Sequence, residues 1–108
     1  MKPMQQGDVF FKPVAKVPEG AVRVLPENGR FILVKGEQTG HAHTIQEEGV
    51  AVWALTRNGI TQLYVDVASP ATVTHEEHDP LILETGVALV DRKRELDFYG
   101  DFERRVVD

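Results

Sequence analysis

The sequence predicts an all-β fold, a single small antiparallel β-barrel or β-sandwich that covers residues 1–108. Short segments rich in Val, Ile, Thr and aromatic residues recur along the chain, and residues that favour turns separate them. No apolar pattern with the period of an amphipathic helix continues for about ten residues. A chain of 108 residues has room for one hydrophobic core, so we expect one domain.

The clearest element is a β-hairpin around Asn58-Gly59, because this dipeptide tolerates the positive φ angles of a type I′ turn. We expect strands over Gly49–Thr56 and Ile60–Val67. Pairing outward from the turn places apolar pairs on the face that points into the core: Ala54 with Leu63, Val52 with Val65, and Val50 with Val67. The opposite face carries Trp53 with Tyr64, Leu55 with Gln62, and Ala51 with Asp66. The pair of Trp53 and Tyr64 is either a partner surface or simply a stabilising cross-strand pair.

A second hairpin is predicted at Asn28-Gly29, between 22–25 and 30–34, although Pro26 cannot donate a hydrogen bond to a neighbouring strand. Proline and other turn residues separate the remaining predicted strands, so each of these is short. They cover residues 8–11, 41–46, 71–76, 81–83, 86–92 and 103–107.

The composition excludes several classes of protein. The net charge of −5 argues against nucleic-acid binding, which requires a basic face. No apolar run approaches the roughly 20 residues of a membrane-spanning helix, and the first residues lack the apolar core of a secretory signal. The chain has no Cys, which excludes disulfides and thiolate metal sites. We therefore expect a cytoplasmic protein without a membrane or nucleic-acid partner.

The four histidines of the chain form two close pairs. His41 and His43 are two residues apart in a predicted strand, so both side chains point to the same face of the sheet. His75 and His78 are three residues apart, so they converge only if the chain bends between them. Asp79-Pro80 follows directly and is typical of a turn, so the sequence permits that bend.

The two histidine pairs predict a site for one divalent transition metal, which we expect to be Zn, Fe, Mn or Ni, because imidazole is a common ligand of these ions. Without Cys, the oxygen ligands on offer are Glu37, Glu47, Glu48, Glu76, Glu77 and Asp79. Glu47 follows His43 by four residues and would complete a mixed site if a turn follows the strand. Two alternatives stay open. The imidazoles either bind an anion or act as acid–base groups without a metal, or they are solvated surface side chains without a function.

The segment Gly36-Glu-Gln-Thr-Gly-His41-Ala-His43-Thr-Ile-Gln-Glu47-Glu48 resembles the first motif of the cupins. The resemblance implies a jelly-roll β-barrel that binds Fe, Mn, Ni or Zn through three His and one Glu. It implies that His41, His43 and Glu47 are ligands, with the remaining histidine ligand supplied by His75 or His78. The chain also resembles short bacterial proteins that carry Thr-Gly-His-x-His and, later, His-x-Glu-His-x-Pro, a likeness that implies no activity.

Two functions fit these residues. In the first, which the sequence favours slightly, the protein is a non-catalytic binding or structural module whose partner surface lies around Trp53 and Tyr64. In the second, it is a cupin-type metalloenzyme whose metal acts as a Lewis acid or activates water or O₂. The general base would then be Glu47, Glu48, Glu76 or Glu77. The small core favours a homodimer, and a small molecule is the expected ligand.

Overall fold

The computed structural model describes residues 1–36 and 40–92 of the chain, and the strand predicted over 103–107 lies outside them. Within the described ranges the strands are β1 (Met4–Gln6), β2 (Val9–Val14), β3 (Val22–Val24), β4 (Arg30–Lys35), β5 (Ala42–Gln46), β6 (Val50–Arg57), β7 (Ile60–Val67), β8 (Ala71–Thr74), β9 (Leu81–Leu83) and β10 (Gly86–Arg92). The ranges predicted for β9 and β10 are confirmed. β1 was missed, because its sequence Met-Gln-Gln lacks the β-branched and aromatic residues that mark a strand.

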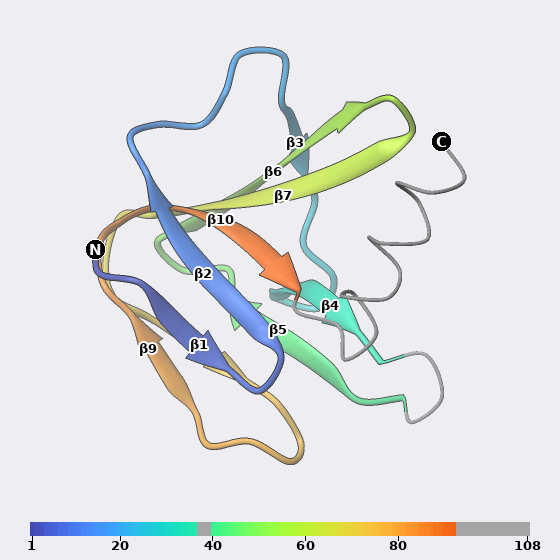
Figure 1. Cartoon of the computed structure of the whole chain (residues 1–108). Coiled ribbons are helices and arrows are strands. Elements are labelled where there is room, and N and C mark those ends of the chain that lie inside the picture. Colours follow the sequence, from blue (N-terminus) through green and yellow to red (C-terminus); the bar gives the residue numbers. More distant parts are fainter. Residues whose placement is uncertain (37–39, 93–108) are drawn as a thin grey trace.

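The strands form two antiparallel sheets (Figure 1). The larger sheet has the order β1-β2-β10-β7-β6-β3, and the smaller sheet has the order β4-β5-β8-β9. This confirms the predicted all-β class as a sandwich. The pairings among the described strands close no barrel, because β1, β3, β4 and β9 stay at sheet edges. None of the described residues forms a helix of the length and hydrophobicity needed to cross a membrane.

The core is built from apolar side chains of both sheets. Alternate residues of a strand point to the same face, so the strands that build the core contribute alternate side chains. The larger sheet supplies Val9, Phe11, Val50, Val52, Val65, Val67 and Ala88, and the smaller sheet supplies Phe31, Leu33, Ile45, Ala71, Val73 and Leu83. These strands position the histidines, of which His43 lies in β5 and the others lie next to β5 or shortly after β8.

The hairpin of β6 and β7 has the predicted register. All six predicted residue pairs are formed, including Trp53 with Tyr64. Asn58 and Gly59 have φ angles of 53° and 76°, as a type I′ turn requires. Local turn chemistry and the apolar pattern agree here, so the sequence alone predicts the pairing.

The turn at Asn28-Gly29 also forms, but the predicted hairpin around it is wrong. Glu27 and Arg30 exchange two backbone hydrogen bonds, of 2.7 and 3.2 Å, across the turn. Beyond this one pair the strands separate, since β3 pairs with β6 in the larger sheet and β4 pairs with β5 in the smaller sheet. Pro26 has no N–H to donate, which ends the pairing and lets the chain pass from one sheet to the other.

Candidate metal centre

The first histidine pair lies at the start of β5. His43 is inside the strand, opposite Val34 of β4, and is 3 % exposed. His41 comes directly before the strand, and its side chain is 30 % exposed. One imidazole of the pair is therefore buried, and the other reaches toward solvent.

The second pair follows β8, the neighbour of β5 in the smaller sheet. The chain bends over residues 76–78, as convergence of His75 and His78 requires. Their ring centroids are 4.6 Å apart. The His75 ring also lies 4.3 Å from the His43 ring and 5.6 Å from the His41 ring, between centroids. The four rings thus form one group, the imidazole cluster, with His75 at its centre.

Glu76 is the carboxylate that the fold places in this cluster. One ligand atom each from His41, His75 and Glu76 lie within 4.8 Å of one another. Metal–ligand bonds of about 2.0–2.2 Å place the ligand atoms of a tetrahedral ion roughly 3.4 Å apart, so side-chain rotations would be needed to bring these three atoms to that spacing. The Glu76 side chain is 50 % exposed, whereas that of His75 is 10 % exposed. The cluster is therefore closed on one side and open to solvent on the side of Glu76.

The structure does not bring Glu47 to the imidazole cluster. Its backbone N–H donates to the Gly29 carbonyl, in the connection between β5 and β6. Glu47 follows the end of β5, whereas His41 and His43 lie at its start. Four residues of extended chain span about 13 Å, which separates Glu47 from His43.

Two backbone N–H groups fix the acidic loop against the histidines. The Ala42 N–H donates to Glu76 Oε2 over 2.9 Å, and this bond is the main cause that keeps the pKa of Glu76 below its ordinary 4.5. The Glu77 N–H donates to His75 Nδ1 over 3.0 Å. The Glu77 carboxylate also lies 3.1 Å from His41 Nδ1. Glu76 is thus ionised near neutral pH, in the form that binds a metal.

Burial keeps His43 uncharged. Its pKa is lowered from the ordinary 6.5 first by burial and then by the neighbouring His75 ring, while Asp8 acts in the opposite direction. Asp8 Oδ1 lies 3.6 Å from His43 Nε2. Burial, the largest single cause, raises the pKa of Asp8. The 3.1 Å hydrogen bond from Arg92, a backbone hydrogen bond and the charge of Arg92 together outweigh burial and hold that pKa below 3.8. A neutral imidazole, like an ionised carboxylate, is the ligand form of the side chain.

The chain matches a family model described as "Domain of unknown function (DUF8820)" over residues 5–93. The chain belongs to this family. No curated protein and no solved structure matches it. The matched range includes all four histidines and the strands that carry them, so the imidazole cluster lies inside the DUF8820 domain.

The second predicted site of this DUF8820 domain, the surface of Trp53 and Tyr64, is less accessible than the sequence suggested. Tyr64 is 7 % exposed, so it offers little area to a partner. The guanidinium of Arg23 lies 5.2 Å from the centroid of the Trp53 ring, a cation–π contact. The cross-strand pair of Trp53 and Tyr64 is formed as predicted.

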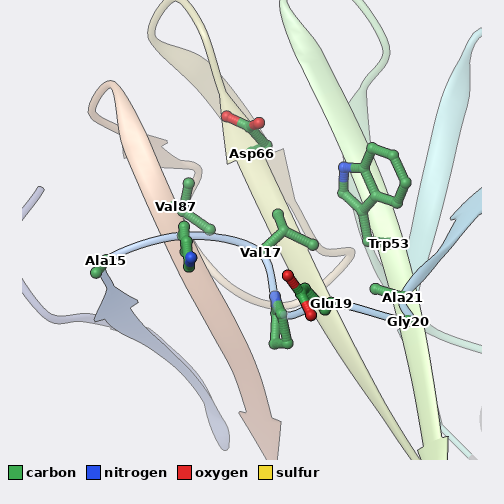
Figure 2. A pocket seen from close by; sticks show the side chains of 10 residues that line it. Ala15, Val17, Glu19, Gly20, Ala21, Trp53, Asp66 and Val87 are labelled. Atoms are coloured by element: carbon green, nitrogen blue, oxygen red, sulfur yellow. The ribbon is translucent and has the colours of Figure 1, made fainter.

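A cavity lies beside Trp53, over the outer face of the larger sheet. Residues 15–21 cross β10, β7 and β6 and enclose a volume of about 420 Å³ against Trp53, Asp66 and Val87 (Figure 2). The indole Nε1 of Trp53 is buried and has no hydrogen-bond partner among the described residues. None of the four histidines lines this cavity.

Sequence reasoning missed the turn between β1 and β2, where Gln6, Gly7 and Asp8 all approach the cluster. Gln6 Oε1 lies 2.8 Å from His43 Nδ1, and Gly7 packs against the His78 ring. Asp8 faces His43 Nε2. The turn precedes His43 by more than thirty residues, as the separation of 37 between Gln6 and His43 shows, so no local spacing marks it.

Proposed function

We propose that this protein binds one divalent transition metal, Zn, Fe, Mn or Ni, at the imidazole cluster and acts as a binding or structural module. The supporting observation is the close approach of His41, His75 and Glu76, which come from two separate segments and place three ligand atoms within 4.8 Å. His43 and His78 add two further imidazoles beside His75. Such a mixture of imidazole and carboxylate suits these ions.

The position of the cluster supports the role of a module. His41 and His43 belong to the start of β5, and His75 and His78 belong to the segment after β8. An ion held by both segments would cross-link them where β5 begins and β8 ends, at one end of the two central strands of the smaller sheet. The cavity beside Trp53 lies over the other sheet and would not deliver a substrate to this ion. The homodimer expected from the size of the core stays a prediction.

Metal analysis of untagged protein and calorimetric titration with Zn²⁺ test the proposal. We expect one ion per chain, and we expect His41→Ala, His75→Ala and Glu76→Gln each to lower the affinity by more than about tenfold. Glu47→Gln is the matched control, because it removes the same charge at the far end of β5. Substoichiometric metal that loading does not raise would indicate a metal-free site. Equal losses in Glu47→Gln and Glu76→Gln would contradict the geometry.

The open side of the cluster favours a second candidate, a metalloenzyme of the cupin type. The side chains of Glu76 and Glu77 are 50 % and 65 % exposed, so an ion bound there would face water on this side. An exchangeable water would allow Lewis-acid chemistry, with Glu77 as the nearby base. Co²⁺ substitution separates the two candidates. A four-coordinate spectrum that azide leaves unchanged supports the module, and a spectrum that azide shifts supports the enzyme.

A further inference from the structure

The turn between β1 and β2 belongs to the larger sheet, yet it contacts the imidazole cluster of the smaller sheet. A Cβ added at Gly7 would overlap the His78 ring, so the backbone of the turn touches that ring directly. Asp8 Oδ1 lies 3.6 Å from His43 Nε2. Gln6, which is 4 % exposed, lies on the other side of the His43 ring, at Nδ1. Side chains at this turn therefore face both ring nitrogens of His43, Gln6 at Nδ1 and Asp8 at Nε2.

The hydrogen bonds of Gln6 determine which way its amide points. Gln6 Nε2 donates to the carbonyl of Val73 over 3.0 Å and to the carbonyl of Asp79 over 2.8 Å. An amide nitrogen has two hydrogens, and both are used by these acceptors, which flank the second histidine pair. The reversed amide would place an oxygen against two carbonyl oxygens. Gln6 Oε1 is therefore the atom that faces His43, and it can only accept.

The Gln6 oxygen in turn determines the tautomer of His43. Nδ1 lies 2.8 Å from this acceptor and must carry the ring hydrogen to donate to it. In the neutral ring, Nε2 then has a lone pair, and it faces the ionised carboxylate of Asp8. Two electron-pair donors that face each other repel unless a cation lies between them. Their 3.6 Å separation is close to that of two ligand atoms on one ion, roughly 3.4 Å.

His75 has the opposite tautomer, although its ring centroid is only 4.3 Å from that of His43. In the metal-free chain its Nδ1 accepts the N–H of Glu77 over 3.0 Å, so Nδ1 carries no hydrogen and Nε2 carries it. Coordination by His75 would therefore displace either the Glu77 N–H from Nδ1 or the hydrogen from Nε2. The hydrogen-bond partners of the two neighbouring rings thus favour opposite tautomers. His75 serves as an internal reference for any measurement of His43.

We propose that Gln6 is a positioning residue of the metal site: it holds His43 as the Nδ1–H tautomer and leaves Nε2, opposite Asp8, to bind the divalent metal. This inference rests on the proposed metal-binding function. It extends the ligand set beyond His41, His75 and Glu76 to the side of the cluster that faces the larger sheet. Outer-shell partners of this kind typically change metal affinity by about 10- to 100-fold when they are replaced.

The tautomer can be measured in the metal-free, full-length chain. Long-range ¹H–¹⁵N correlation of ¹⁵N-labelled protein near pH 8, where imidazoles are neutral, distinguishes a protonated from an unprotonated ring nitrogen. We expect His43 to be protonated at Nδ1 and His75 at Nε2. A His43 ring that is protonated at Nε2, or that averages the two tautomers, would overturn the inference without any variant being made.

Two substitutions separate positioning from a purely structural role. Gln6→Leu removes the acceptor, whereas Gln6→Glu keeps an acceptor but loses both amide hydrogens. In Gln6→Leu we expect the His43 ring to lose its preference for the Nδ1–H tautomer, while the tautomer of His75 stays unchanged. We also expect Zn²⁺ binding to weaken by about 10- to 100-fold. Gln6→Glu should keep the His43 tautomer and more of the affinity, even if both variants lose stability. Gln62→Leu, at an exposed position of β7, is the control.

The outcomes distinguish this inference from the proposed function. If the native chain binds Zn²⁺ and Gln6→Leu binds it with equal affinity, Gln6 has no positioning role and the metal site stands. If the native chain binds no metal, the proposed function fails, and the positioning role fails with it. If Gln6→Leu does not fold, two measurements still test the inference: the His43 tautomer of the native chain and that of Gln6→Glu. Loss of the Nδ1–H form in Gln6→Glu would also contradict the inference.

Discussion

Gly7 is the residue whose side chain, a single hydrogen, lets the β1–β2 turn contact the cluster. Its φ is +59°, and a Cβ at this position would overlap the imidazole of His78. Two effects therefore oppose any larger residue here. One is the strain of a positive φ, and the other is the displacement of His78.

Replacing Gly7 tests these two effects against Gly59, which has a φ of +76° but open space around its Cβ position. We expect Gly59→Ala to lower the free energy of unfolding by about 1–2 kcal/mol through backbone strain alone. Gly7→Ala should cost about 1–3 kcal/mol more, because His78 must also move. Urea unfolding of the two variants measures the difference. Equal losses would show that His78 yields freely and that the contact is unimportant.

His43 makes the metal-free protein sensitive to acid. Its pKa in the fold is below 6.5, because burial and then His75 disfavour the charged ring, and His78 adds to this effect while Asp8 opposes it. The unfolded chain, with an ordinary pKa, therefore binds a proton first as the pH falls. Stability is unaffected well above pH 6.5 and is lost as the pH falls from 6.5 through the lowered pKa. Asp8 contributes a loss of the same sign only near and below pH 3.8.

We therefore expect the free energy of unfolding of the metal-free protein to fall between about pH 7.5 and pH 5, by up to about 1.4 kcal/mol for each unit that separates the folded and unfolded pKa values of His43, and the urea midpoint to fall with it. The ring C–H resonances of His43, followed by NMR over the same range, report its pKa directly. A midpoint that stays constant or rises on acidification would contradict the assignment of a buried, neutral His43.

At the scale of elements, two identical Asn-Gly turns behave differently. Asn28 and Asn58 both have a φ of 53°, so the dipeptide fixes the turn at each position. The strands on either side of Asn58-Gly59 carry an apolar face and pair along their length, as the sequence predicted. Those around Asn28-Gly29 separate into different sheets, where β3 pairs with β6 and β4 pairs with β5. Turn chemistry is a local property, but the partner of a strand is decided by the whole fold.

The same distinction explains how much of the candidate site could be predicted. The spacing of each histidine pair is local, and the fold meets the bend required between His75 and His78. The choice between Glu47 and Glu76 depends on which strands are neighbours. A carboxylate four residues along a strand is about 13 Å away, whereas Glu76 reaches the Ala42 N–H because β5 lies beside β8. Gln6 is 37 residues from His43, and no pattern in the sequence marks its contact with that ring.

At the scale of the whole molecule, the cluster joins parts of the chain that are distant in sequence. The proposed ligand atoms come from the start of β5 and from the segment after β8, and the β1–β2 turn of the larger sheet lies against the His78 ring. An ion bound by these groups would be bound by the folded chain only, because the unfolded chain does not hold the ligands together. Metal binding is then linked to the folding equilibrium.

We expect Zn²⁺ to raise the thermal midpoint of the protein. An ion at one hundred times its dissociation constant stabilises the folded state by about 2.7 kcal/mol, and each kcal/mol raises the midpoint of a domain of this size by about 4–8 °C. Calorimetry with and without Zn²⁺ measures the shift, and excess chelator should reverse it. A chain with both His41→Ala and His75→Ala should show almost none of it, while Glu47→Gln should show all of it. A full shift in the double variant would mean that the metal binds elsewhere on the chain, and a shift lost in Glu47→Gln would move the site to the other end of β5.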